Sequence, residues 1–309
     1  MTTVSIIMAA YNAQDSISRA IESFQKQTLT DWELIIIDDG STDKTSKILN
    51  DFAAEDSRIK VIHTVNRGVA AARQTGIEHS SGVFTIHADA DDWVENNMLE
   101  RMYSHAIENN SDMTVADYYV NHLNGKQEKI CQKLDSNRPE DVIFQLYAKN
   151  LFGGLCHKLI KKTVYDNKKV YFEPTINFCE DKLLLTKILY LNPNLRISYL
   201  PEAFYHYEMT PTSITRSVTP EKFENIKRFH DIFPQYLPNQ DRFKDVIKLE
   251  ALHLFLIGFI YKIFSPKEIH REFTKIKKEA FKTKSPRWFL GYLCIYLRLH
   301  NIARKLIRY

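Results

Sequence analysis

The first 120 residues alternate between short β-branched apolar runs and longer stretches with helical periodicity, and this alternation constrains the fold most. Apolar runs typical of strands occur at residues 4–8, 34–37, 59–63, 83–87 and 113–120. Helical stretches lie between them at residues 16–27, 45–54, 69–79 and 94–109. Such a rhythm predicts an α/β fold with a Rossmann-like, mostly parallel central sheet flanked by helices.

Polar residues follow four of the predicted strands. The strand ends lead into AAYN at 9–12, DDGSTD at 38–43, NRG at 66–68 and DADD at 89–92. In open α/β sheets, ligands bind outside the carboxyl ends of the strands. We therefore expect a binding site at this edge of the sheet.

Three aspartates, Asp89, Asp91 and Asp92, fall within four positions at the end of the fourth strand. One of them could simply cap the helix that begins near residue 94, with the others solvated. An Asp-X-Asp at a strand end also suits a hard divalent cation, because carboxylate oxygens are its preferred ligands. A second acidic strand end in the same sheet favours the metal site over the cap.

The adjacent pair Asp38 and Asp39 is not explained by a glycine turn and a helix cap in DDGSTD. A carboxylate here could accept a hydrogen bond from a nucleobase imide or a ribose hydroxyl. Arg73 is either a surface charge or the counter-charge of the carboxylates or of a phosphate. The chain has neither G-x-G-x-x-G nor a Walker motif, which argues against dinucleotide and P-loop chemistry.

After residue 120 the alternation loosens. We expect a polar loop or edge hairpin at 121–138, helices at 140–149 and 180–191, and strands at 156–160, 195–200 and 204–207. Beyond Pro220 the pattern is helical, with breaks near 234–238, Pro266 and Pro286. The sequence thus predicts an α/β domain over residues 1–219 and a helical C-terminal region over 220–309.

Charge is distributed unevenly along the chain. Residues 1–110 contain 9 basic and 17 acidic side chains, whereas from Lys282 onward there are seven basic residues and no acidic ones. These basic residues alternate with apolar and aromatic ones, which fits either contact of 262–309 with an anionic membrane surface or a packing role in dimerisation. The acidic sheet edge argues against nucleic acid as a partner.

Features of secreted or membrane-spanning chains are not seen. The N-terminus lacks a basic segment followed by a long apolar one, and the apolar run at 252–261 is too short to cross a bilayer. The four cysteines are widely scattered, as in proteins of reducing compartments. We expect a cytoplasmic protein, at the inner face of the membrane if the membrane alternative holds.

Four ordered stretches resemble a known family. They are VSIIMAAYN (4–12), WELIIIDDGSTDKT (32–45), NRGVAAARQTGI (66–77) and HADADDW (87–93). Together they look like the N-terminal half of an inverting family-two glycosyltransferase with the GT-A fold. The resemblance is dense over about residues 3–120 and continues to about 215. It implies a nucleotide-sugar-binding half at 1–120 and an acceptor half at 121–219.

The resemblance implies roles for individual residues at the donor site. Ala9, Tyr11 and Asp39 match positions that line the nucleoside pocket, with Asp39 the expected partner of a uracil imide, so that a UDP-sugar is the favoured donor. Arg73 matches a basic position near the diphosphate. The chain departs from the family pattern at two places. It has Ala9 where family members usually have Pro, and Ala72-Arg73-Gln74 where they usually have Ala-Arg-Asn.

The acidic cluster matches the DxD motif of the family. Asp89 is implied to contact ribose or metal and Asp91 to bind Mn²⁺ or Mg²⁺, with Asp92 an additional carboxylate. His206 could be a third metal ligand, but a packed or capping histidine is the favoured alternative.

The stretch CHKLIKK (156–162) followed by NFCED (177–181) resembles a later family pattern, in which Asp181 is the expected catalytic base. The resemblance therefore implies transfer of a sugar to a hydroxyl of a glycan or lipid-linked acceptor, in the synthesis of cell-surface polysaccharide. Two alternatives remain: a non-catalytic nucleotide-sugar-binding protein and a nucleotidyltransferase. The DxD motif and the candidate base Asp181 are both present, which argues against the non-catalytic alternative. The loop AAYNAQD lacks the glycine-rich basic pattern that nucleotidyltransfer favours, which argues against the second.

Overall fold

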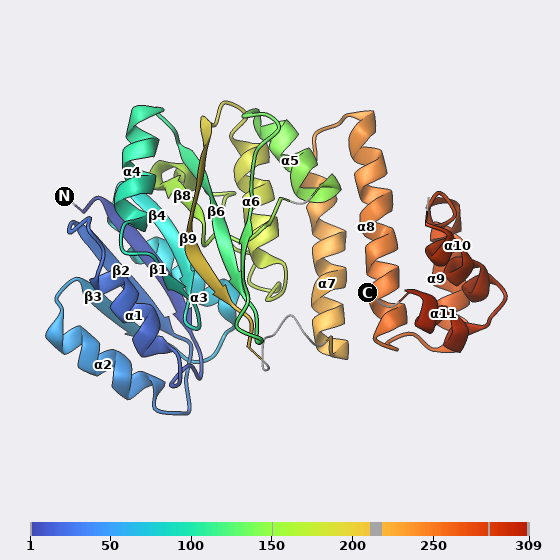
Figure 1. Cartoon of the computed structure of the whole chain (residues 1–309), viewed down its shortest axis with the longest axis horizontal. Coiled ribbons are helices and arrows are strands. Elements are labelled where there is room, and N and C mark those ends of the chain that lie inside the picture. Colours follow the sequence, from blue (N-terminus) through green and yellow to red (C-terminus); the bar gives the residue numbers. More distant parts are fainter. Residues whose placement is uncertain (1, 150, 211–217, 284, 308–309) are drawn as a thin grey trace. The chain divides into compact units, whose positions relative to one another are not determined.

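The computed structural model describes residues 2–149, 151–210, 218–283 and 285–307. The chain divides into two compact units, residues 1–213 and 214–309. The first is an α/β unit and the second is helical (Figure 1). This division lies six residues before the predicted boundary at 219–220, and α7 (Pro220–Ile232) is the first helix of the second unit.

The first unit combines a nine-stranded sheet with six α-helices in the part of the chain described. Its elements in chain order are β1 (Val4–Ala10), α1 (Ile17–Gln25), β2 (Trp32–Asp38), α2 (Thr45–Glu55), β3 (Ile59–His63), α3 (Val69–His79), β4 (Phe84–Asp89), β5 (Trp93–Val94), α4 (Met98–Glu108), β6 (Met113–Asn121), β7 (Gln127–Ile130), α5 (Pro139–Ala148), β8 (Lys158–Lys161), η1 (Lys162–Asp166), α6 (Glu180–Leu191) and β9 (Ile197–Glu208).

The strands form one mixed sheet in the order β3-β2-β1-β4-β8-β6-β9-β5, with β7 paired to β6. β3, β2, β1 and β4 run parallel, as do β6 and β9, and these pairings contain most of the paired residues. The shorter pairings of β8, β7 and β5 are antiparallel. The predicted α/β fold with a mostly parallel sheet is confirmed.

The two faces of the parallel strands are buried by different helices. Alternate residues of β1 such as Ile6 and Met8 belong to a core that also contains Ile21 of α1 and Leu99 of α4. On the opposite face, Ile35 and Ile37 of β2 pack with Ala72 of α3 and with Ala9. Burial on both faces explains why these strands read as continuous apolar runs.

Two details of the strand prediction were wrong. Residues 195–200 and 204–207 form one strand, β9, rather than two, because the strand continues through a register irregularity opposite Asp117. The helix expected over 94–109 begins only at Met98, since Trp93 and Val94 pair with His206 and Tyr205 as the short strand β5. The segment 121–138 contains the edge strand β7, as the hairpin alternative predicted.

The second unit is helical over its described residues. The breaks near 234–238, Pro266 and Pro286 occur as predicted, and a further break at 297–299, where Arg298 has a φ of 63°, was not predicted. Its elements are α7, η3 (Phe233–Tyr236), α8 (Asp241–Ile260), α9 (Pro266–Ala280), α10 (Pro286–Tyr296) and α11 (His300–Ile307). Ser265 caps α9 in a capping box with Glu268, and Ser285 caps α10, each directly before a proline. None of the helices described is both long and apolar enough to span a membrane.

Candidate active site

The register of the parallel strands brings three of the predicted polar strand ends together. Ala9 of β1 lies beside Ile37 of β2 on one side and beside Asp89 of β4 on the other. Asp38 is the last residue of β2 and pairs with Ala10. The carboxyl ends of β1, β2 and β4 therefore form one continuous edge.

The loops after β1 and β2 are joined by hydrogen bonds. Asn12, whose φ of 49° is left-handed, donates its backbone N–H to Ser41 Oγ, and its side-chain oxygen accepts the Thr42 N–H at 2.8 Å. Tyr11 precedes it with 52% of its surface exposed. The two loops thus present an exposed aromatic ring at the sheet edge, next to Ala9.

The two carboxylates after β2 have separate environments. Asp38 accepts hydrogen bonds from Ser46 Oγ and His63 Nδ1, at 2.5 and 2.9 Å, and holds the loop in place. Burial opposes its ionisation, but these hydrogen bonds outweigh it and lower its pKa. Asp39 accepts the backbone N–H groups of Arg67 and Gly68 at 2.9 and 2.8 Å, and so links β2 to the loop before α3.

Gly68 is required at the start of α3. Its φ is 89°, and a Cβ built there would lie 2.4 Å from the side chain of Asn177. Asn177 in turn accepts the N–H of Ala70 at 3.2 Å. The loop before α6 is thereby held against the beginning of α3.

Arg73 joins the two acidic regions of the predicted site. Its buried guanidinium donates to Asp89 at 2.6 Å, to Glu180 at 2.6 Å and to Asp181 at 2.5 Å. Asp89 ends β4, whereas Glu180 and Asp181 form the first turn of α6, more than ninety positions later. Arg73 is therefore the counter-charge of three carboxylates, one of the alternatives the sequence left open.

Asp181 is a largely buried carboxylate whose pKa is raised. Burial and the nearby charges of Glu180 and Asp89 raise its pKa to about 7, against the opposing effect of Arg73 and of a hydrogen bond from the Leu155 backbone. Its side chain still has 21% of its surface exposed. A solvent-accessible carboxylate with a pKa near neutrality has the properties of a general base.

The other two aspartates of the acidic cluster differ in their partners. Asp92 is buried and accepts hydrogen bonds from the Tyr205 hydroxyl at 2.6 Å and from the Glu208 backbone at 2.8 Å. Asp91 is partly exposed, and its carboxylate is not among the hydrogen-bond acceptors of other described residues; Arg19 donates to its backbone carbonyl instead. Burial and the charge of Asp89 raise the pKa of Asp91 to about 6.

These surroundings fit a divalent cation at Asp89 and Asp91. The charge of Arg19 and a backbone hydrogen bond favour the ionised form of Asp91 less than burial and Asp89 oppose it, and a cation would supply the missing compensation. Asp92 fits less well, because both of its oxygens already accept hydrogen bonds. No group of three or more candidate ligands occurs among the described residues, so the protein offers few ligands of its own.

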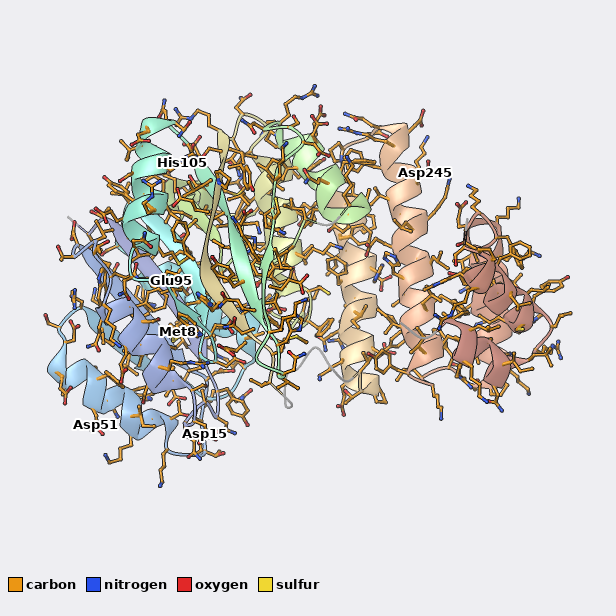
Figure 2. The ribbon with its side chains drawn as sticks, viewed as in Figure 1. Met8, Asp15, Asp51, Glu95, His105 and Asp245 are labelled. Atoms are coloured by element: carbon orange, nitrogen blue, oxygen red, sulfur yellow. The ribbon has the colours of Figure 1, made fainter. Side chains whose placement is uncertain are left out.

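His206 is packed, as the favoured alternative predicted. Its Nε2 is paired with Glu95, labelled in Figure 2, at 3.0 Å, and its Nδ1 lies 3.3 Å from the amide nitrogens of Asn121 and Gln127. Its ring stacks on Trp93 at a centroid distance of 3.5 Å. Because both ring nitrogens have partners, His206 does not join the acidic cluster as a ligand.

Sequence reasoning missed a buried lysine beside the site. Lys158 donates to the carbonyls of Phe152 and Gly154 at 2.8 and 2.7 Å, and lies 2.7 Å from His157 Nε2. Burial lowers its pKa to about 7. It fixes the loop whose Leu155 N–H reaches Asp181. A lysine within the apolar run CHKLI was the signal available.

Tyr205 was also missed as a link within the acidic cluster. Its hydroxyl donates to Asp92 and accepts the backbone N–H of Asp89 at 3.0 Å. It thereby couples the position of Asp92 to the end of β4. This link depends on the pairing of β5 with β9, which the sequence pattern did not predict.

Comparison with known sequences places the chain among glycosyltransferases. Residues 5–181 match the family described as Glycosyl transferase family 2. The chain is 31% identical over 240 residues to the UDP-Glc:alpha-D-GlcNAc-diphosphoundecaprenol beta-1,3-glucosyltransferase WfgD of Escherichia coli, covering 76% of this chain and 87% of that protein. It is 29% identical over 218 residues to the glycosyltransferase EpsJ of Bacillus subtilis, covering 69% of this chain but only 62% of EpsJ, less than two thirds of its length.

Comparison with solved structures concerns the fold. Residues 1–349 of TarS from S. aureus, crystallised with UDP-GlcNAc, superpose with a TM-score of 0.69, covering 99% of this chain and 90% of that one at 20% sequence identity. The structural neighbours have the GT-A fold. The expected GT-A fold is therefore confirmed.

Proposed function

The chain belongs to glycosyl transferase family 2, and on that premise we propose that it is an inverting enzyme that uses a nucleotide-diphosphate sugar, with a UDP-sugar favoured. Its acceptor would be a hydroxyl of a glycan or lipid-linked molecule in cell-surface polysaccharide synthesis. The observation that carries the proposal is the arrangement around Arg73, which brings Asp89 and Asp181 together from distant parts of the sequence.

Asp181 is the proposed catalytic base. Its carboxylate takes the proton of the acceptor hydroxyl while the acceptor oxygen forms a bond to the anomeric carbon. The bond from that carbon to the diphosphate oxygen breaks, and the nucleoside diphosphate leaves with the electron pair. A single displacement inverts the anomeric configuration. General-base assistance of this kind contributes about 10²–10⁴-fold to a rate.

The donor end of the site is proposed at the strand edge. Ala9 and Tyr11 would line the nucleoside pocket. Asp39 accepts hydrogen bonds from the backbone of Arg67 and Gly68 and a longer one from the Thr64 hydroxyl. Because a carboxylate can accept about four hydrogen bonds, one acceptor position remains for a uracil imide.

Asp89 and Asp91 would hold Mn²⁺ or Mg²⁺, which when bound neutralises negative charge on the diphosphate. Asp92 has a positioning role in this proposal, because its hydrogen bonds to Tyr205 and Glu208 fix the acidic segment. Arg73 holds Asp89 and Asp181 close together and offsets part of their negative charge. The chain's own residues thus supply orientation and the base.

We propose the cytoplasm, at the inner face of the membrane, as the place of reaction. The E. coli relative is named for a diphosphoundecaprenol-linked acceptor, and a UDP-sugar would meet such a lipid at the membrane surface. We propose that the acceptor half of the site lies within residues 121–219.

A panel of UDP-, GDP- and dTDP-sugars, each tested with Mn²⁺, with Mg²⁺ and with chelator, would test the proposal. We expect release of UDP that depends on the metal and increases with a suitable acceptor. Binding of the donor without turnover would support a non-catalytic sensor instead. Release of pyrophosphate would support nucleotidyltransfer.

A further inference from the structure

The segment that contains the last two described helices has a row of large, exposed apolar side chains along its sequence. Six of these residues are each between 45% and 56% exposed. We call this row the apolar stripe; it consists of Phe289, Leu290, Tyr296, Leu297, Leu299 and Ile302. Single exposed apolar residues are ordinary on proteins, but six within fourteen positions form a patch that calls for a function.

The geometry of α10 separates the apolar stripe from the core. Phe289, Leu290, Tyr296 and Leu297 recur at helical spacing on one face of the helix. On the opposite side, Tyr292 and Ile295 are buried in the core of the second unit. α10 is therefore apolar on two sides. On the stripe side, Phe289 contacts the ring of Phe281 at a centroid distance of 5.4 Å, and its neighbour Leu290 is 48% exposed.

The helices α10 and α11 form one closely packed hairpin. Gly291 of α10 permits this, because a Cβ there would lie 2.5 Å from Ile307 of α11. Arg287 Nε donates to the Leu306 carbonyl at 2.7 Å and ties the two helices together. Leu299, just before α11, and Ile302, within it, thereby belong to the same hairpin as the α10 residues.

The charged residues in the segment that contains the apolar stripe are of one sign. Arg298 and Lys305 are exposed beside it, and the sequence has no Asp or Glu after Glu279. An apolar surface with exposed aromatic rings and basic neighbours is complementary to an anionic lipid surface, where rings and alkyl chains enter the interface while cations meet headgroups.

We propose that the apolar stripe docks the protein onto an anionic membrane, with α10 and α11 lying in the plane of the interface. The two helices have 11 and 8 residues, which suits lying on a bilayer and not crossing it. A dimer through this face is disfavoured, because a two-fold interface would bring Arg298 and Lys305 of both copies into one contact, and the segment after Glu279 has no acidic residue to pair with them. This inference names the surface that makes the membrane contact proposed above, and it does not depend on the transfer reaction.

The test is co-sedimentation of the full chain with vesicles, in the absence of any donor or acceptor. Wild type is expected to sediment with phosphatidylglycerol-containing vesicles at low ionic strength, and much less with phosphatidylcholine alone. The pair Leu290→Ser with Leu297→Ser, and separately Arg298→Asn with Lys305→Gln, should each lower the partition coefficient by at least about tenfold. Ile107→Ser on α4 is the matched control, since Ile107 is as exposed as Leu297, at 56%.

A direct measurement covers the case in which a variant folds poorly. Tyr296→Trp should place an indole within the stripe, and lipids with a spin label in the acyl chain should quench its fluorescence beyond that of wild type. Equal binding to neutral and anionic vesicles, binding unaffected by either pair, or absence of quenching would each overturn the proposal. So would a dimer in sedimentation velocity that the leucine pair dissociates, because the stripe would then be a protein interface.

Discussion

Both units of the chain bury apolar side chains, but they differ in how many charged side chains they bury. In residues 1–213 charged groups lie inside, among them Arg73, Asp92 and Lys158. In residues 214–309 the core consists of apolar and aromatic side chains, and Glu250 is the one buried charged residue among those described. The second unit instead keeps charges in surface pairs one helical turn apart, such as Lys248 with Asp245.

The difference shows where chemistry can occur. A buried charge costs free energy unless partners compensate it, so a cluster such as Arg73 with its three carboxylates lowers stability relative to apolar packing. Perturbed pKa values cluster at functional sites for this reason. The second unit has a packed apolar core and an exposed apolar stripe, and no comparable group of buried charges is found among its described residues.

The largest expected effect comes from Asp181→Asn. The amide keeps the shape of the side chain but cannot accept the acceptor's proton, so transfer should fall by about 10²–10⁴-fold. Metal-dependent binding of UDP, measured by calorimetry, should persist. Glu279→Gln, which removes a surface carboxylate of the second unit, is the control and should leave transfer unchanged. Normal transfer by the Asp181 variant would show that another group is the base.

Replacing the buried lysine is expected to act on stability. Lys158→Met removes the donor to the Phe152 and Gly154 carbonyls and leaves them unpaired in the interior, so the free energy of unfolding should fall by about 2–4 kcal/mol. Lys248→Met on α8 should change it by less than about 0.5 kcal/mol, because Lys248 is in an exposed ion pair. Urea denaturation followed by circular dichroism measures both. Similar effects of the two substitutions would contradict the contrast between the units.

The pH dependence of transfer follows from the raised pKa of Asp181. Burial favours the protonated carboxyl, and a base must be deprotonated, so the rate should rise with pH and level off above about 7. Below that value it should fall by up to about tenfold per pH unit. The profile is measured as kcat/KM over a range in which circular dichroism shows a folded chain.

A surface carboxylate supplies the comparison for this profile. Hydrogen bonding to Lys248 lowers the pKa of Asp245, labelled in Figure 2, so it is ionised throughout that range. Asp245→Asn should therefore leave the midpoint unchanged. A wild-type profile that stays flat through neutrality would exclude a base with the pKa of Asp181.

The sequence predicted the parts of the fold that local patterns determine. The four parallel strands, their helices and the proline breaks of the second unit follow from periodicity and turn chemistry, and α3 and α6 were found at their observed bounds. The errors fell at β5 and β9, where pairing between Trp93 and His206 decides the structure. The strand β5 has only two residues, which is too short for an alternating apolar pattern, so its pairing with β9 cannot be predicted from the local sequence.

The candidate site shows the same limit. Resemblance placed Asp89, Asp91 and Asp181 in the site, but not the contacts among them, because these depend on how α3 and α6 pack. Arg73 was expected near a diphosphate, and the structure adds that it holds Asp89 and Asp181 together. The sequence groups Asp92 with the metal ligands, but its hydrogen bonds to Tyr205 and Glu208 depend on the position of β9, which local patterns do not determine.

The smallest expected effect concerns the stability of the second unit. Leu297→Ser changes a side chain that is 56% exposed, so the free energy of unfolding should change by less than about 0.5 kcal/mol. Ile295→Ala, two positions earlier but buried, should lower it by about 2–5 kcal/mol, since it leaves a cavity in the core. Urea denaturation monitored at Trp288, which packs against that core, reports on both. Equal losses of unfolding free energy would mean that Leu297 is packed in solution, and the apolar stripe could not then be a free surface. A much smaller loss for Leu297→Ser would mean that folding does not require the Leu297 side chain.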